Sequence, residues 1–402
     1  MLHRPPLALY VHLPWCVRKC PYCDFNSYAL RGELEEGRYL ESLQRDLDRQ
    51  AAEVEGRQVI SVFFGGGTPS LFAPRSIARV LELAGERLAL APDLEVTLEA
   101  NPGTVERGRF TEYRAAGVNR VSLGAQSFDP ARLEALGRIH SPAETRRAAE
   151  ELHGAGIRNF NLDLMYGLPG QDVAGAARDL REALALEPAH ISHYQLTLEP
   201  GTPFAARPPA LPAEEDVEGM LDACTAALEQ AGFGRYEVSA YATQGRRCRH
   251  NLNYWSFGDY LGIGAGAHGK LTRTHPGQVM RSAQPRDPRR YMAAAGGAAP
   301  VFAPVPEGEL PFEFMLNALR LVEGFERSTY LERTGLAWES VGEKLERLAG
   351  EGLIRQEASW YRATALGLRF LNEILLRFVA ERPRSVGDSQ MSTSPASAPA
   401  LD

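Results

Sequence analysis

In the first half of the chain, short apolar runs alternate with longer polar or amphipathic stretches. This pattern restricts the possible folds of the chain more than any other feature of the sequence. The runs have the length of β-strands, and the stretches between them are long enough for helices. Successive βα units with apolar strands build a parallel sheet that helices cover. Six such units predict an α/β fold with a partial (β/α)6 TIM-type barrel, and a doubly wound open sheet is the alternative. The predicted strands are residues 7–11, 59–64, 94–99, 120–125, 157–164 and 190–198.

The same pattern divides the 402 residues into successive parts. Residues 1–200 hold the predicted barrel, and 201–282 form a less regular extension of it. Residues 283–311 contain six prolines and predict a Pro/Ala-rich connection with little structure. Residues 312–380 return to helical periodicity and end in a small hairpin, which is typical of a winged-helix-like domain. Residues 381–402 are rich in Ser, Pro and Ala and predict a disordered tail.

The charge balance argues against nucleic acid as a partner. The chain has 44 Lys and Arg against 51 Asp and Glu, a net charge of −7. Residues 312–379, within the winged-helix-like part, have nine basic and ten acidic side chains, a net charge of −1. A DNA-reading helix without a basic surround binds phosphates poorly. We therefore expect no nucleic-acid partner.

The hydropathy and the cysteines bear on location. No stretch reaches the roughly 18 consecutive apolar residues that a membrane helix needs, and the first residues show no signal-peptide pattern. An odd, clustered set of five cysteines suits a reducing compartment better than a disulfide framework. We expect a cytoplasmic protein that contacts a membrane only through a partner.

Three of the cysteines fall within eight residues, directly after the first predicted strand. Cys16, Cys20 and Cys23 have the spacing C-x3-C-x2-C, which suits a [4Fe–4S] cluster with three thiolate ligands and one iron open to a small molecule. Structural zinc is the alternative, with His12 as a candidate fourth ligand. Cys224 lies on the apolar face of a helix predicted near residues 216–230, so we expect it in the core.

Polar or glycine positions follow the next strands in turn. The second predicted strand leads into Gly65-Gly66-Gly67-Thr68-Pro69, where backbone groups are open to a ligand. Glu99 ends the third strand, Gln126 follows the fourth, and Asp163 lies on the fifth. Parallel barrels build their sites at the carboxyl ends of their strands. The sequence therefore predicts one site at that rim.

Taken together, these motifs resemble those of the radical S-adenosylmethionine (SAM) enzymes. Further segments are similar to the oxygen-independent coproporphyrinogen III oxidase group, and the resemblance covers about residues 7–380. It implies a [4Fe–4S] cluster on the three cysteines, SAM on its open iron and an electron donor that reduces it. The segments are Tyr10-Val-His-Leu-Pro-Trp-Cys16, Val121-Ser-Leu-Gly-Ala-Gln126-Ser-Phe128 and Asp163-Leu-Met-Tyr-Gly-Leu-Pro169.

The resemblance also implies roles for single residues, and it leaves open whether one or two SAM molecules bind. Positions that match contacts to a first SAM are Tyr10, Gly66 and Glu99. Positions that match the oxidase's second SAM are Tyr22, Gly67, Thr68, Gln126, Arg138 and Asp163.

Two departures separate this chain from the oxidase itself. Phe25 stands where the oxidase has a fourth cysteine, and the first cysteine is already residue 16, which leaves no room for the oxidase's N-terminal extension. A further motif, His250-Asn251-Leu-Asn-Tyr254-Trp255, matches the H-N-x-x-Y-W signature of HemW, the haem chaperone branch of the family.

That motif suits a porphyrin. An imidazole can ligate haem iron, aromatic rings can pack on the macrocycle, and arginines can pair with propionates. The expected residues are His250, Asn251, Tyr254 and Trp255, with Arg246, Arg247 and Arg249 for the propionates and Cys248 as a second candidate ligand. Stabilising a turn on the barrel's flank is the motif's alternative role.

The branch implies a protein that binds haem and passes it to a recipient haemoprotein. The alternative is an oxygen-independent coproporphyrinogen III oxidase. Whether the chain also acts as an enzyme stays open.

Overall fold

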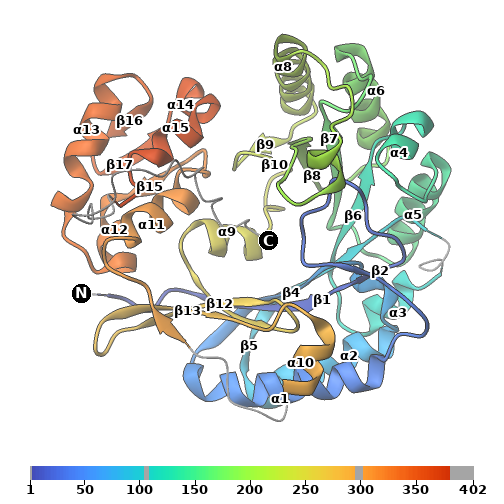
Figure 1. Cartoon of the computed structure of the whole chain (residues 1–402), viewed down its shortest axis with the longest axis horizontal. Coiled ribbons are helices and arrows are strands. Elements are labelled where there is room, and N and C mark those ends of the chain that lie inside the picture. The colour runs from blue at the N-terminus through green and yellow to red at the C-terminus, as the bar shows by residue number, and fades with distance from the viewer. Residues whose placement is uncertain (1, 104–107, 295–301, 381–402) are drawn as a thin grey trace, which may run out of the picture.

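The structure is a computed structural model that describes residues 2–103, 108–294 and 302–380. One curved sheet encloses a central space and carries helices on its outer side (Figure 1). All six predicted strands are present, and each pairs in parallel with the next, so the predicted α/β fold with a parallel sheet is confirmed. They are β1 (Leu7–Leu13), β4 (Gln58–Gly66), β5 (Ala89–Ala100), β6 (Arg120–Gln126), β7 (Phe160–Tyr166) and β8 (His190–Gln195).

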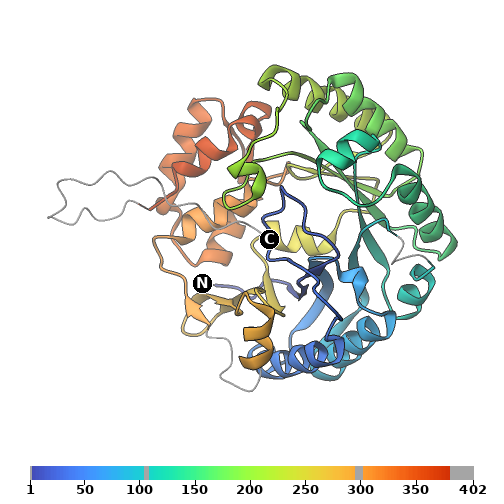
Figure 2. The same ribbon diagram turned by 45° about the vertical axis from the view of Figure 1, so that its right-hand side comes forward.

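A further parallel strand comes from the less regular part of the sequence. β11 (Asp259–Ile263) pairs in parallel with β1, on the side away from β4. Antiparallel strands extend both edges: β12 (His268–Arg273), β13 (Gln278–Ala283) and β14 (Ala303–Pro304) on one, β10 (Ala240–Ala242) and β9 (Gly234–Arg235) on the other. The order is β14-β13-β12-β11-β1-β4-β5-β6-β7-β8-β10-β9, so the described strands form a partial barrel (Figure 2).

The outer helices lie where strand–helix alternation places them. Alternating strand residues fill the apolar core between sheet and helices, and Cys224 belongs to this core, as predicted. The helices are α1 (Glu36–Ala51), α2 (Pro74–Arg87), α3 (Phe110–Ala115), α4 (Pro130–Ala135), α5 (Pro142–Gly154), α6 (Val173–Leu184), the short α7 (Pro203–Ala206) and α8 (Glu214–Gln230).

The predicted Pro/Ala-rich connection has more structure than expected. Within 283–311, residues Pro288–Ala294 form helix α10, while 295–301 lie outside the described residues. Tyr291 of α10 is buried, and its hydroxyl donates a hydrogen bond to Asp46 of α1 at 2.9 Å. One aromatic side chain with a buried acceptor therefore anchors a segment whose composition indicated a linker.

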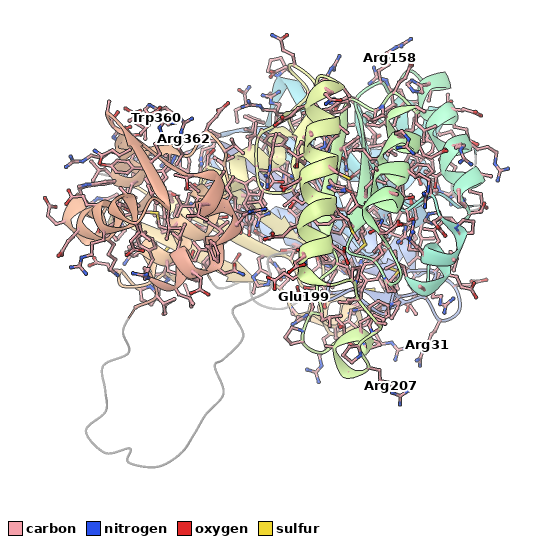
Figure 3. The ribbon with its side chains drawn as sticks, turned by 90° about the horizontal axis from the view of Figure 1, so that it is seen from above. Arg31, Arg158, Glu199, Arg207, Trp360 and Arg362 are labelled. Atoms are coloured by element: carbon pink, nitrogen blue, oxygen red, sulfur yellow. The ribbon has the colours of Figure 1, made fainter. Side chains whose placement is uncertain are left out.

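The C-terminal module combines helices with a small hairpin, as the winged-helix-like prediction requires. Its core also takes Phe257 and Val279 from the barrel side, so the two parts pack together. Figure 3 shows the module beside α8. Its elements are α11 (Leu310–Ala318), β15 (Phe325–Glu326), α12 (Arg327–Thr334), α13 (Gly342–Gly350), β16 (Ile354–Glu357), β17 (Trp360–Ala363), α14 (Ala365–Arg369) and α15 (Leu371–Leu376).

The predicted disordered tail, 381–402, lies outside the described residues. In the described parts of the chain, no helix combines the length and apolarity needed to cross a membrane.

Buried histidines predict acid sensitivity. Burial lowers the pKa of His193 to about 3, and its ring stacks on Tyr166 at 4.6 Å. In the unfolded chain the same histidine has a pKa near 6.5. As pH falls below 6.5, His193 therefore binds a proton in the unfolded chain but not in the folded chain, which favours unfolding. The contribution of neutral His193 to the free energy of unfolding is complete above pH 6.5 and is lost as pH falls toward 3. About 2 kcal/mol of it is lost by pH 5.

We therefore expect His193→Phe to flatten the fall in unfolding free energy between pH 7.5 and pH 5, measured by denaturant titration. His3→Gln, at an exposed position, is the control and should leave the slope unchanged. Equal slopes for His193→Phe and the unsubstituted chain would contradict the prediction.

Candidate functional site

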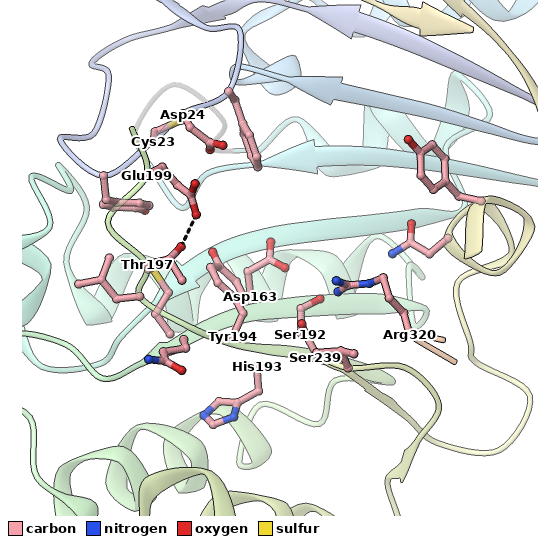
Figure 4. A pocket seen from close by; sticks show the side chains of 18 of the residues that line it. Cys23, Asp24, Asp163, Ser192, His193, Tyr194, Thr197, Glu199, Ser239 and Arg320 are labelled. Atoms are coloured by element: carbon pink, nitrogen blue, oxygen red, sulfur yellow. Dashed lines mark hydrogen bonds between the residues drawn. The ribbon is translucent and has the colours of Figure 1, made fainter. Parts of the chain in front are cut away.

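A cavity of about 2060 Å³ opens inside the partial barrel and extends to the C-terminal module. Sixteen predicted site residues line it: the three cysteines, the nine SAM positions and the four H-N-x-x-Y-W positions. Figure 4 shows one part of the cavity, with Cys23 and Asp24 on one side and Asp163, Tyr194 and Ser192 on the strands opposite.

The three cysteines lie on a loop that two short strands close at its base. β2 (Trp15–Cys16) pairs with β3 (Tyr28–Ala29), and Cys20 and Cys23 lie on the chain between them. All three thiols are half-buried, and burial raises the pKa of Cys16 and of Cys23. Soft sulfur donors on one loop beside a large cavity fit an iron–sulfur cluster.

His12 is committed to other contacts on both ring nitrogens. Its Nε2–H donates to the carbonyl of Asn26 at 2.9 Å, so its Nδ1 accepts from the Tyr10 hydroxyl, also at 2.9 Å. Burial lowers its pKa to about 4, which keeps the ring neutral. The zinc alternative therefore loses the fourth ligand that the sequence offered.

The glycine run lies against the start of the cysteine loop. Gly66 has φ +114°, and a Cβ there would stand 2.6 Å from His12 Cε1. A Cβ on Gly67 would stand 2.6 Å from the Trp15 carbonyl oxygen. The Gly66 N–H donates to Glu99 Oε2 at 3.2 Å. The fold itself requires these two glycines, whatever ligand they also hold.

Arg138 ties three predicted positions together. Its guanidinium donates to the Asn101 side-chain oxygen and, at 2.6 Å, to the Gly124 carbonyl. Its Nη1 lies 3.7 Å from Cys20 Sγ. Asn101 in turn donates to Thr68 Oγ1 at 2.8 Å. A positive charge is thus held beside one cysteine by fixed contacts.

Gln126 and Asp163 are also held firmly. Gln126 has φ +65°, a conformation uncommon outside glycine, and its Oε1 accepts from the Tyr194 hydroxyl at 2.7 Å. Asp163 accepts from Ser122 at 3.1 Å and from Asn161 at 2.7 Å, and burial raises its pKa. Phe25, at the fourth-cysteine position, is 43% exposed and also lines the cavity.

The H-N-x-x-Y-W motif folds as a helix, α9 (Arg249–Trp255), between the C-terminal module and the barrel strands (Figure 1). The carboxylate of Glu95 accepts the backbone N–H groups of Arg249 and His250, each at 3.0 Å, which satisfies two free donors of the helix N-terminus. His250 contacts β4 at Ser61, five residues before Gly66, so about 16 Å of strand separates motif from glycine run. The motif therefore lies toward one end of the cavity, which we call the lower end, and the cysteines toward the other, the upper end. Between them, the ring centroid of Tyr10 lies 6.3 Å from that of His250.

The imidazole of His250 is buried in an aromatic corner. Its Nδ1 lies 3.2 Å from Ser61 Oγ, and its ring centroid lies 4.9 Å from that of Phe63. Burial, and then the charge of Arg120, lower its pKa to about 3, so the ring is neutral. Nearby, the guanidinium of Arg320 lies 4.4 Å over the Trp255 ring.

The residues expected beside the motif do not all face the cavity. Arg247 pairs with Glu323 at 2.7 Å and Arg249 with Asp93 at 3.0 Å, and Arg246 is exposed outside the cavity lining. Cys248 is buried, its pKa is raised to about 12 by burial, and it is absent from the described cavity lining. The structure therefore does not bring these four side chains to the described cavity lining with the motif, and their contact with a porphyrin stays a prediction.

Other arginines line the cavity instead, and sequence reasoning missed them. They include Arg120 on β6, Arg281 on β13 and Arg320 after α11. A signal existed for one of them, because Arg120, Ser122, Gly124 and Gln126 alternate along a predicted strand and so share its inner face.

Comparison with known proteins agrees with this site. Residues 10–183 match the radical SAM superfamily, and residues 305–370 match the HemN C-terminal domain. The heme chaperone HemW of Escherichia coli K12 is 47% identical over 381 residues, which cover 95% of this chain and 100% of that protein. The chain belongs to the HemW family.

Other HemW relatives and one solved structure extend the comparison. The heme chaperone HemW of Haemophilus influenzae is 45% identical, over 94% of this chain and 99% of its own length. The mouse mitochondrial radical S-adenosyl methionine domain-containing protein 1 is 37% identical, over 93% and 87%. The structure of coproporphyrinogen III oxidase (HemN) from Escherichia coli matches with a TM-score of 0.78 at 22% identity, over 93% of this chain and 90% of that one, and so shares the fold. Membership of the radical SAM superfamily implies a SAM-binding [4Fe–4S] cluster.

The close approach at Gly66 makes a testable prediction for this HemW-family chain. Gly66→Ala combines a left-handed φ with a clash against His12, so we expect it to destabilise the fold by about 2 kcal/mol or more. Gly154→Ala is the matched control, because nothing lies within 4 Å of its added Cβ. Thermal unfolding compares the two, and equal midpoints would show that residue 66 tolerates a side chain.

Proposed function

We propose that this chain is a haem chaperone, which binds haem in the described cavity and passes it to a recipient haemoprotein. The observation that carries the proposal is that α9, with its H-N-x-x-Y-W motif, lines the same cavity as the three cysteines. The 47% identity over nearly the whole chain to a protein named heme chaperone HemW supports it.

At the upper end, Cys16, Cys20 and Cys23 hold the [4Fe–4S] cluster. When it is bound and reduced by an external electron donor, the cluster supplies the electron that cleaves SAM. Around it, Tyr10, Gly66 and Glu99 contact a first SAM. The proposal leaves the number of SAM molecules at one or two, and the residues proposed for a second are Tyr22, Gly67, Thr68, Gln126, Arg138 and Asp163.

At the lower end, His250 is the residue for the haem iron. In the tautomer whose Nδ1–H donates to Ser61 Oγ, the Nε2 lone pair is free to bind a metal, and the Ser61 hydroxyl can accept that bond. Tyr254 and Trp255 offer flat apolar faces, and Asn251 a polar edge, from the same helix. The neutral ring suits ligation, because a protonated imidazole cannot bind a metal.

The cluster assignment has a direct test. Anaerobically reconstituted protein should hold about four irons per chain and, once reduced, give an EPR signal that changes when SAM is added. Cys16→Ser, Cys20→Ser and Cys23→Ser should each lose most of the iron, whereas Cys224→Ser, in the core, should keep it. Stoichiometric zinc without iron uptake would contradict the assignment.

The haem assignment is tested on the same protein. We expect about one haem per chain, a Soret band that His250→Ala weakens or shifts, and transfer to an apo-haemoprotein faster than free haem release allows. His153→Ala is the matched control, because His153 bonds the Leu186 carbonyl outside the cavity. Conversion of coproporphyrinogen III to protoporphyrinogen IX without haem retention would instead support the oxidase.

The partners follow from this function. They are haem, a recipient haemoprotein and an electron donor, and the cytoplasm is the proposed compartment. The acidic C-terminal module gives no support to a nucleic-acid partner.

A further inference from the structure

A buried arginine lines the lower end of the cavity and has no hydrogen-bond or ion-pair partner among the described residues. Arg120 opens β6, is 2% exposed, and its Nε has no hydrogen-bond partner. Within the described residues, no hydrogen bond or ion pair reaches its guanidinium. Burial by itself lowers the pKa of Arg120 and the nearby charges of Glu95 and Asp163 raise it, yet a buried guanidinium with an unpaired N–H is costly and needs an explanation, of which a bound ligand is one.

The nearest acidic groups are engaged elsewhere. Glu95 accepts the backbone N–H groups of His250 and Arg249, one on each carboxylate oxygen. Asp163 accepts from Ser122 and Asn161. Both carboxylates are close enough to raise the pKa of Arg120, but among the described residues neither forms an ion pair or a hydrogen bond with its guanidinium.

The other groups around this part of the cavity do not supply negative charge. Burial and the charge of Arg120 keep His250 and His190 neutral. Two more N–H donors on the cavity wall, Trp255 Nε1 and Arg320 Nε, are buried without a hydrogen-bond partner. Of the buried, unpaired side-chain atoms in the described cavity lining, three are N–H donors, one is an acceptor (Asn317 Oδ1), and His193 Nδ1 can take either role. This surplus of donors, one of them on a buried guanidinium, fits an anionic ligand that is rich in oxygen acceptors.

We infer that Arg120 binds a carboxylate of the molecule that occupies the lower cavity. Resting on the proposed function, that carboxylate is a propionate of haem. The methionine carboxylate of SAM has the same chemistry, but Arg120 and Gln126 stand at opposite ends of β6, about 20 Å apart. Arg120 therefore lies near His250 and far from the cysteine loop, where the first SAM would bind, although its charge also acts on Asp163, a position proposed for a second SAM.

The experiment compares a free diacid with its ester on the full-length, reconstituted protein. Soret titrations measure binding of haemin and of haemin dimethyl ester, and calorimetry measures binding of SAM. The variants are Arg120→Gln and Arg120→Lys, with Arg146→Gln, an exposed arginine on α5, as the matched control. Circular dichroism checks the fold of each.

The unsubstituted protein should bind haemin roughly tenfold to a hundredfold more tightly than the dimethyl ester. Arg120→Gln should remove most of that difference by weakening haemin alone, Arg120→Lys should keep part of it, and SAM affinity should not change. If Arg120→Gln does not fold, the comparison of acid and ester on the unsubstituted protein and on Arg120→Lys decides.

Equal affinity for haemin and its ester in the unsubstituted protein would overturn the inference while leaving haem binding intact. Loss of SAM affinity with unchanged haemin affinity would also overturn it and assign Arg120 to the SAM carboxylate. Absence of any haem binding by the unsubstituted protein would overturn the inference and the proposed function together.

Discussion

The imidazole of His12 lies between the Tyr10 hydroxyl and the Asn26 carbonyl, and it fills the space that a side chain at residue 66 would need. The Tyr39 hydroxyl of α1 donates to the His12 carbonyl at 2.8 Å. Strand β1, the cysteine loop, the glycine run and α1 therefore all meet at one residue. Burial lowers the pKa of His12 to about 4, so the ring is neutral and its Nδ1 accepts the Tyr10 hydroxyl while its Nε2–H donates to Asn26.

What the sequence could predict follows from how local each contact is. Cys16, Cys20 and Cys23 share one loop, so their spacing alone predicts that they lie together. Glu99 and Gln126 come together because the carboxyl ends of parallel strands meet at one rim, so strand assignment was enough. The sequence could not predict the position of α9, because that position depends on a contact with Glu95, which is 155 residues from His250 in the chain. The sequence indicated what the motif is made of but not which end of the barrel it closes.

The sequence also did not predict which arginine side chains face the cavity. Arg247 and Arg249 flank the motif in sequence, yet each is drawn outward by an acidic partner from another element, Glu323 and Asp93. Arg120 is remote in sequence and faces inward because strand residues alternate between the two faces of the sheet. Nearness along a chain is therefore a poor guide to which charges meet a ligand, and strand alternation is a better one. Tyr291 is a similar case, since only its buried acceptor, Asp46, reveals that its segment is a helix packed on α1.

The C-terminal module completes the cavity where the sheet is open. Arg320 reaches the barrel side and pairs with Glu237 at 3.1 Å, while Arg281 of β13 pairs with Glu313 of α11 at 2.6 Å. Figure 4 shows the Arg320 side chain directed toward the strand residues that include Ser192. Ion pairs with both partners mostly buried have a fixed geometry, unlike exposed pairs that solvent screens. A module of this shape and of slightly acidic charge is thus better explained as the cavity's remaining wall than as a reader of DNA, and its arginine brings a positive charge to the same space as Arg120.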